Sequence, residues 1–396
     1  MMEQQNFAVI NAGSSSLKFS LFAATSAGPV RRIRGQIAEI NSAPVFSARI
    51  GTHSAEPDRL LGESYSGHHR CLNFLLEWLE QHAQVHAAGH RVVHGGLHYS
   101  QPVVLDAAII TALEALIPLA PLHQPHNLQP IHALAKLHPG LMQIACFDTA
   151  FHASKRKEAR QFPLPATLKE AGVRRYGFHG LSYEYIAMKL KEVDPDLAPK
   201  RVVVAHLGNG ASMCALHQGK AVDSTMGLTA ADGLPMGTRS GSLDPGVVFF
   251  MAREMNMPLD TIEDILYRQS GLKGLSGLTH DMRLLEQSSD PRASDAIDLF
   301  VYRIQQQFGA LSASLGGLDG AVFTAGIGEN SHLIRSKVLK GLQWLGFERD
   351  EQANARHATC ITTRQSPIPA YVIPTDEDLM IAHHVQHILS KTQASS

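Results

Sequence analysis

VINAGSSSLKFSLF, residues 9–22, is an apolar run, a turn of small residues and a second apolar run. Two β-rich runs around such a turn predict a β-hairpin. The same order recurs in VAHLGNGASMCALH, residues 204–217, and the two copies share a serine, Ser16 in one and Ser212 in the other. One hairpin near the start of each half suggests a duplicated, two-lobed chain with a nucleotide between the lobes. Two unrelated glycine-containing hairpins are the alternative.

Outside these hairpins, short β-rich runs alternate with amphipathic helices, which predicts an α/β fold. The length of 396 residues favours two domains over one. Strands are expected at 91–93, 142–147, 201–205, 321–324 and 371–373, and helices at 71–81, 106–117, 127–137, 183–193, 293–315 and from 331. Thr375 or Asp376 is expected to cap the last helix.

The composition argues against several classes of partner. Lysine and arginine number 35 against 36 aspartates and glutamates, without a basic stripe, so neither nucleic acid nor a membrane surface is expected. The most apolar span, residues 107–122, contains a glutamate and two prolines and predicts a buried helix. Four scattered cysteines and a start unlike a signal peptide indicate a cytoplasmic protein. The pairs His68-His69 and His383-His384 lack the spacing of a helical zinc motif.

Three segments rich in small residues could bring backbone amides close to phosphate oxygens. The first is Asn11–Lys18, where Lys18 adds a positive charge, although the segment is not a strand-loop-helix phosphate loop. The others are His206–Ser212 and Ala325–Ser331, the latter between an apolar strand and a helical pattern. Each could equally be a plain turn, but three in one chain favour a ligand.

Four further residues are candidates for the chemistry itself. Arg239 lies in a loop of glycines and prolines, and Arg91 precedes paired glycines on a buried strand, where a guanidinium needs an anionic partner. Asp148 ends a strand, a common place for active-site groups in α/β proteins. His179 lies between an aromatic residue and a glycine. Taken singly, each residue could also be structural.

Ten segments, in order, resemble the acetate kinase family from residue 11 to about 383. They are INAGSSSLKF, GHRVVHGG, PLAPLHQPHN, CFDTAFH, RYGFHGLS, AHLGNGAS, DSTMGLTAADGLPMGTRSG, GLSGLTHDMR, FTAGIGENS and PTDEDLMIA. The resemblance implies a two-lobed actin-like ATPase (ribonuclease H-like) fold, with duplicated α/β domains and a nucleotide cleft between them. It implies an N-terminal, acid-binding lobe of residues 1–150 plus 378–396 and a nucleotide-binding lobe of residues 151–377, usually in a homodimer.

The same resemblance implies reversible transfer of the ATP γ-phosphate to acetate, assisted by Mg²⁺ with Mn²⁺ as a substitute. It assigns the metal to Asn11 and Glu377, catalysis to Asp148, His179 and Arg239, and the acid to Arg91. The nucleotide-binding residues that it implies are Lys18, His206, Leu207, Gly208, Asn209, Gly210, Asp281, Met282, Arg283, Gly326, Ile327, Gly328, Glu329 and Asn330. Val92 and Val93 are expected to wall the methyl group of the acid.

Two departures from the family pattern are visible. Leu97 follows the paired glycines where a glutamate is usual, and Gln124 and His126 alter the PLHNPxN pattern, which keeps His123 and Asn127. The alternatives are a propionate kinase, or another short-chain acyl kinase, because one methylene changes binding by only about 1–3 kcal/mol, and a non-catalytic ATP-binding protein of the same fold. The latter would not need Arg91, His179 and Arg239 together.

Overall fold

The computed structural model describes residues 5–13, 15–51, 54–121 and 123–395. Ser14 and Leu122, which belong to the quoted motifs, lie outside the described residues. The chain forms two compact units, Met1–Ala150 with Asp376–Ser396, and Phe151–Thr375. Asp376 and Glu377 therefore belong to the first unit, whereas the resemblance placed them in the second. Arg31 and Arg91, both of the first unit, pair with these two carboxylates.

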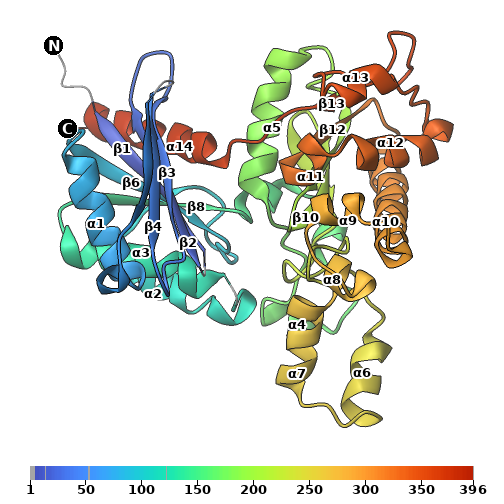
Figure 1. The fold of residues 1–396 in the computed structure, drawn as a ribbon, viewed down its shortest axis with the longest axis horizontal. Helices are drawn as coiled ribbons and strands as arrows, with labels where there is room; N and C mark the ends of the chain where they lie inside the picture. The colour runs from blue at the N-terminus through green and yellow to red at the C-terminus, as the bar shows by residue number, and fades with distance from the viewer. Residues whose placement is uncertain (1–4, 14, 52–53, 122, 396) are drawn as a thin grey trace. The chain divides into compact units, whose positions relative to one another are not determined.

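The first unit is built on a sheet whose described strands follow the order β5-β4-β3-β2-β1-β6-β8-β7 (Figure 1). The expected hairpin is present, because β1 and β2 pair antiparallel, and β1, β6 and β8 run parallel to one another. The strands are β1 (Asn6–Ala12), β2 (Ser16–Ala23), β3 (Val30–Ala38), β4 (Val45–Ile50), β5 (Ser54–Leu60), β6 (Val85–Val92), β7 (Val103–Val104) and β8 (Met142–Phe147).

Helices cover both faces of this sheet. Ala8 and Ile10 share a buried apolar cluster with Leu75 of α1 (His68–Glu80) and Leu134 of α3 (Gln124–Leu137). On the other face, Gly89 leaves room for α14 (Glu377–Ser395), because a Cβ there would lie 2.6 Å from a methyl of Val385. Another helix of the unit is α2 (Ala107–Glu114). Asp106 caps it, since its side chain accepts from the backbone N–H of Ile109.

The second unit repeats the central strand order of the first. Its described strands follow the order β11-β10-β9-β12-β13, in which β11, β10 and β9 are antiparallel and β9, β12 and β13 are parallel. In the first unit, β3-β2-β1-β6-β8 has the same order and the same directions. The duplicated α/β architecture predicted from the two hairpins is thus confirmed. The strands are β9 (Arg201–Leu207), β10 (Ala211–His217), β11 (Lys220–Ser224), β12 (Gly320–Thr324) and β13 (Ala370–Val372).

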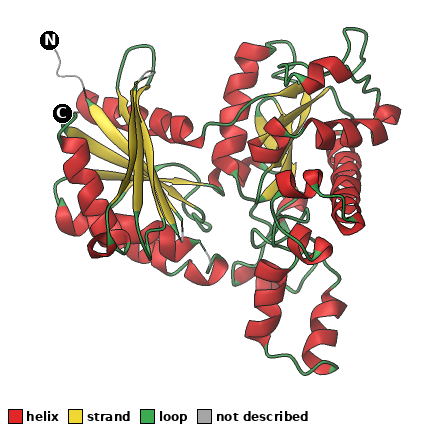
Figure 2. Cartoon of the chain, in the orientation of Figure 1, coloured by secondary structure: helices red, strands yellow, loops and turns green. Residues whose placement is uncertain are grey.

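The helices of the second unit differ greatly in length (Figure 2). The 25-residue α10 packs on β9, β10 and β11 through an apolar stripe that includes Ile297, Phe300 and Ile304, as its periodicity predicted. The helices are α4 (Ala166–Glu170), α5 (Gly180–Val193), α6 (Pro245–Arg253), α7 (Leu259–Asp264), α8 (Gly271–Ser276), α9 (Met282–Gln287), α10 (Pro291–Leu315), α11 (Ala325–Asn330), α12 (His332–Gly341) and α13 (Glu351–Ala355). Within the described residues, none is long and apolar enough to cross a bilayer.

Two local expectations are resolved by the structure. Asp376, rather than Thr375, caps the last helix, because its carboxylate accepts from the backbone N–H of Leu379 at 3.0 Å. The glycine-rich segment after β12, expected as a turn, forms the short helix α11 instead. Its first residue, Ala325, has a φ of 65°, an unfavourable left-handed conformation for a residue with a Cβ.

Candidate active site

Arg91, Asp148 and Glu377 form a charged cluster in the first unit. Arg91 lies near the end of β6, and Asp148 follows β8, so the parallel strands bring both side chains to one edge of the sheet. Arg91 donates from Nε and Nη2 to the two carboxylate oxygens of Asp148, at 3.2 and 2.7 Å. A carboxylate oxygen of Glu377 lies 3.6 Å from Arg91 Nε. This is the bidentate geometry that fixes a guanidinium in position.

The electrostatics of this cluster keep Arg91 charged. Burial alone would lower the pKa of Arg91, but Asp148 and Glu377 outweigh burial and raise that pKa above its ordinary value. The Asp148 side chain is only 1% exposed, whereas Arg91 keeps 21% exposure. Among the described residues, the third guanidinium nitrogen of Arg91, Nη1, has no hydrogen-bond partner. An incoming anion can therefore reach Arg91 without displacing Asp148.

The residues assigned to the metal lie in the same unit. Asn11 is in β1 and pairs in register with Lys18 of β2, so both side chains lie on one face of the hairpin. Glu377 begins α14, which packs on β1 and β6. The described residues include no cluster of three or more side chains suited to a complete metal cage. An amide oxygen and one carboxylate nevertheless fit Mg²⁺, which is usually bound by one or two carboxylates together with substrate phosphates and water.

The altered PLHQPHN segment supports the loop after Arg91. The Asn127 amide accepts from the N–H of Val93 and donates to the carbonyl of Ala12, each at 3.0 Å. The Gln124 amide accepts from the N–H of His94 and donates to its carbonyl, each at 3.1 Å. The departure at Gln124 therefore retains a side-chain amide that pairs with backbone.

Leu97, the other departure from the family pattern, is exposed, whereas Val92 and Val93 are buried. Leu97 is 49% exposed. Val92 packs into an apolar cluster with Leu113 and Leu128. Its expected place beside the acid stays a prediction. Val93 is buried, is not a member of the described cluster of Val92 or of that of Ala8 and Ile10, and remains the candidate wall residue.

In the second unit, three predicted nucleotide segments line one cavity of about 620 Å³. They come from the β9–β10 turn, from the start of α9 and from α11. The predicted residues at the cavity are Gly208, Asn209, Asp281, Met282, Arg283, Gly326, Ile327 and Asn330. Ser331, the last residue of the candidate segment Ala325–Ser331, also lines it. His280 and Glu286 line it too and were not predicted, although His280 directly precedes a predicted segment. Segments far apart in sequence thus form one concave surface with backbone amides at a glycine turn.

Other residues of the predicted nucleotide set have structural contacts instead. Glu329 accepts hydrogen bonds from the backbone N–H groups of Ala325 and Thr375, which ties α11 to the end of the unit. Gly328 is buried, and its carbonyl accepts from Arg335. Leu207 is fully buried. These residues do not line the cavity and support its walls.

His179 and Arg239 meet at the turn of the second hairpin. A Cβ placed on Gly210 would lie 3.2 Å from His179 Nε2 and 3.8 Å from Arg239 Nη1, so both side chains converge on this glycine. Arg239 Nη1 donates to the carbonyl of Ala230 at 2.9 Å. The loop that carries Arg239 is fastened to the turn by a hydrogen bond from Gly237 N–H to the carbonyl of Asn209. The imidazole and the guanidinium can therefore act on one ligand.

A buried hydroxyl network orients His179. Its Nδ1 contacts Ser212 Oγ at 2.8 Å, and Ser212 in turn contacts the hydroxyl of Tyr183. Tyr183 is fully buried, and among the described residues Ser212 is its single hydrogen-bond partner. The tyrosine proton therefore goes to Ser212, and the serine proton to Nδ1. Neutral His179 consequently carries its proton on Nε2, the nitrogen that faces Gly210.

His206 contributes to the same region as a neighbour of His179. The two rings stack with centroids 4.2 Å apart, and His206 Nδ1 contacts Ser182 Oγ at 2.8 Å. Ser182 also contacts Thr375 Oγ1 at 2.9 Å. Ser182 and Tyr183 were not among the predicted site residues, although they lie one helical turn after His179 on α5. Ser212 ends the candidate segment His206–Ser212 but was given no role beside His179.

These features match known proteins along nearly the whole chain. The structure resembles an acetate kinase from Porphyromonas gingivalis, with a TM-score of 0.88, 34% identity and coverage of 97% of this chain and 100% of that chain. It also resembles a propionate kinase from Francisella tularensis, with a TM-score of 0.89, 34% identity and coverage of 96% and 98%. Together with the repeated strand order, these likenesses define a kinase of the actin-like ATPase fold.

Sequence similarity gives the family. The model of the acetokinase family matches residues 6–383. A protein from Nitrobacter hamburgensis named acetate kinase is 50% identical over 392 residues, covering 98% of this chain and 97% of that protein. A protein from Rhodopseudomonas palustris strain TIE-1, also named acetate kinase, is 51% identical over 385 residues, which cover 95% of this chain and 96% of that protein. This chain belongs to the acetokinase family.

Proposed function

We propose that the protein is an acetate kinase, which transfers the γ-phosphoryl group of ATP reversibly to acetate and yields acetyl phosphate and ADP. The observation that carries the proposal is the meeting of the predicted segments in the second unit. Three of them line one cavity, and His179 and Arg239 converge on the glycine turn that forms part of its wall. A family match over residues 6–383 supports the same reaction.

The acid is held by Arg91. Acetate is ionised at pH 7, so no base is needed to generate the nucleophile. Arg91 offers Nη1 to the acid carboxylate, while Asp148 keeps the other edge of the guanidinium fixed. Asp148 is thus proposed as a positioning residue rather than a base, because its carboxylate is buried and already paired.

Arg239 and His179 stabilise the transferring phosphoryl group. Phosphoryl transfer is accelerated mainly by positioning and by neutralising charge on the equatorial oxygens. Arg239 supplies a permanent positive charge, and His179 donates a hydrogen bond from Nε2. When bound at Asn11 and Glu377, Mg²⁺ would neutralise charge on the ATP phosphates. Lys18 adds a cation on the face of the hairpin that carries Asn11.

The nucleotide occupies the cavity of the second unit. Met282 and Ile327 offer apolar surface for the base, and Gly208 and Asn209 bring backbone close to the phosphates. Arg283 pairs with Asp281 at 2.6 Å and is 85% exposed, so its guanidinium can contact a nucleotide at the rim of this cavity. This assignment uses residues that converge in the fold although they lie more than 100 positions apart, from Gly208 to Gly326.

A propionate kinase is the second candidate, since a solved relative carries that name. Val93 favours the smaller acid, because its branched side chain fills more of the pocket wall than alanine would. A difference of one methylene corresponds to about 1–3 kcal/mol, so overlapping activity is expected.

The deciding experiment is a hydroxamate assay for acyl phosphate with acetate, propionate and butyrate, with and without Mg²⁺. We expect kcat/KM to be highest for acetate and to vanish when the metal is chelated. A higher kcat/KM for propionate would make this a propionate kinase. ATP binding without any acyl phosphate would instead identify a non-catalytic nucleotide-binding protein.

We also propose a cytoplasmic homodimer. Exposed apolar side chains gather on and around α6, where Phe249 and Phe250 are 55% and 57% exposed and Leu259, at the start of α7, is 71% exposed. A cluster of this kind is typical of a protein-protein contact. The family resemblance supports a second copy of the same chain as the partner.

A further inference from the structure

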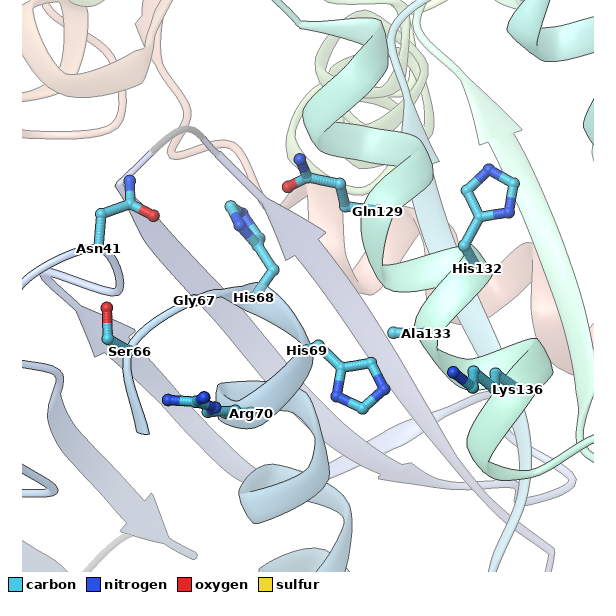
Figure 3. Close-up of a pocket in the computed structure, with 10 residues that line it drawn as sticks. All are labelled: Asn41, Ser66, Gly67, His68, His69, Arg70, Gln129, His132, Ala133 and Lys136. Carbon is cyan, nitrogen blue, oxygen red and sulfur yellow. The ribbon is translucent and has the colours of Figure 1, made fainter. Parts of the chain in front are cut away.

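A second cavity lies in the first unit, between the beginning of α1 and one face of α3 (Figure 3). Its volume is about 750 Å³. Figure 3 shows the side chains of α1 on one side and those of α3 on the other. The residues with polar side chains on these helices are His68, His69, Arg70, Gln129, His132 and Lys136.

The lining of this cavity is positively charged. Arg70 and Lys136 line it, and no aspartate or glutamate among the described residues does. Among the described residues neither cation has an ion-pair partner, although Arg70 donates to the carbonyl of Ser64 at 3.1 Å. The imidazoles do not form a metal site, because the described part of the chain holds no group of three or more suitable ligands. His132, which also lines the cavity, pairs with Glu114 at 3.0 Å, so the acidic group nearest the lining is already engaged. Two cations without an ion-pair partner among the described residues favour an anion.

The wall of the cavity also holds the turn of the first hairpin. His68 Nε2 contacts the carbonyl of Gly13 at 2.9 Å. The neighbouring Gly67, which also lines the cavity, donates its N–H to the carbonyl of Ile40, whose own N–H donates to the carbonyl of Ser15. Two paths of hydrogen bonds therefore run from the cavity wall to Gly13 and Ser15, which lie between β1 and β2.

We propose that this cavity is a regulatory site for a phosphate-bearing anion, separate from the nucleotide cavity of the second unit. The anion bridges Arg70 of α1 and Lys136 of α3, with His69 and Gln129 as further hydrogen-bonding groups. Binding draws the start of α1 toward α3 and shifts the hairpin turn through His68 and Gly67. The kinetic consequence, a changed KM for ATP, rests on the proposed role of the hairpin in binding nucleotide phosphates.

Binding is tested by calorimetry on the full-length protein saturated with Mg-ADP, at constant ionic strength. Inorganic phosphate and glycerol 3-phosphate serve as probes and distinguish a free anion from a phosphate monoester. We expect one of them to bind the wild type and to bind the Arg70→Gln, Lys136→Gln double variant at least about tenfold more weakly, because charge-assisted hydrogen bonds are lost. Arg32→Gln, which removes an exposed cation elsewhere in the same unit, should bind normally.

The variant Arg239→Ala distinguishes anion binding in this cavity from anion binding at the proposed catalytic site. It should retain anion binding, and thermal unfolding should show that every variant is folded. Wild type that binds neither probe, binding that survives the double substitution, or binding lost in Arg239→Ala would each overturn the proposal.

In steady-state kinetics the bound probe should change the KM for ATP at least about twofold in the wild type and not in the double variant. Binding without this change would overturn the coupling to the hairpin, and neither outcome depends on which acid is the substrate.

Discussion

Tyr183 tests the orientation of His179. Replacing it by phenylalanine removes the donor that directs the Ser212 proton toward Nδ1, so His179 can place its own proton on either nitrogen. Tyr183→Phe should therefore lower kcat about tenfold, an effect the size of one buried hydrogen bond. The KM values for ATP and acetate should change little. Steady-state kinetics check this, with Tyr302→Phe on the exposed face of α10 as the control. A raised KM with normal kcat would refute the orienting role.

For single residues, the sequence identified candidate side chains of the site but not the residues that they contact. Arg91 and Asp148 could be singled out because each lies at the end of an apolar strand, where parallel strands deliver side chains to one edge. Their bidentate pairing depends on β6 and β8 being neighbours, which local sequence does not state. Ser212 and Tyr183 meet only after β10 and α5 pack in the second unit. The structure also places Val92 in an apolar cluster, because side chains on a strand alternate between faces.

The packing of α14 on the first sheet depends on Gly89. A Cβ there would lie 2.6 and 2.7 Å from methyl groups of Val385 and Ile381, whose branched side chains have little freedom to move. Gly89→Ala should reduce the free energy of unfolding by about 1–3 kcal/mol, as overpacking does. Denaturant unfolding measures this. Gly140→Ala is the matched control, because a Cβ there meets nothing within 4 Å. Equal stability of the two variants would contradict the packing described for α14.

Buried histidines should make the fold sensitive to acid. Burial lowers the pKa of His90 and of His94 to about 4, and that of His152 to about 3. The unfolded chain, with ordinary histidine pKa values near 6.5, binds more protons between about pH 6.5 and 4. Stability is therefore fully present above pH 6.5 and is lost as pH falls through this window, by about 1.4 kcal/mol per pH unit for each histidine.

The variant His90→Leu measures how much His90 contributes to the loss of stability at low pH. Thermal or denaturant unfolding at several pH values should give a shallower loss of stability between pH 6.5 and 4 than in the wild type. His217→Leu, at an exposed position, should leave the slope unchanged. An unaltered slope in His90→Leu would mean that His90 is not the neutral, buried group described.

Elements whose apolar residues repeat at a regular spacing could be predicted from the sequence. Elements in which a residue without an apolar side chain interrupts that spacing could not. The long α10 repeats apolar residues on one face, and its expected start lay within a few residues of Pro291. The strand β3 was not predicted, because its buried residues Ile33 and Ile37 lie four apart, which is closer to a helical than to a strand spacing. The intervening inward position is Gly35, where a Cβ would lie 2.4 Å from the Phe19 ring, so no apolar side chain marks the alternation.

For the whole molecule, the apolar cluster on α6 predicts self-association. Phe249→Glu with Phe250→Glu places charges on this surface and should convert a dimer into monomers, because burying unpaired carboxylates at a contact is costly. Analytical ultracentrifugation measures the mass of the particle. Trp344→Glu is the control, since Trp344 is 70% exposed but lies on a different part of the second unit. A double variant that remains dimeric would exclude this surface.

Arg91 is proposed to hold the acid and Arg239 to stabilise the transferring phosphoryl group, and one measurement tests both roles most directly. The measurement is the trapping of radiolabelled ADP by aluminium fluoride, an analogue of the phosphoryl group in transfer, in the presence of Mg²⁺ with and without acetate. We expect wild type to trap ADP only when acetate is present, Arg91→Ala and Arg239→Ala each to lose trapping by about 10³ or more, and Arg32→Gln to behave as wild type. Trapping that ignores acetate, or that persists in either arginine variant, would contradict these roles.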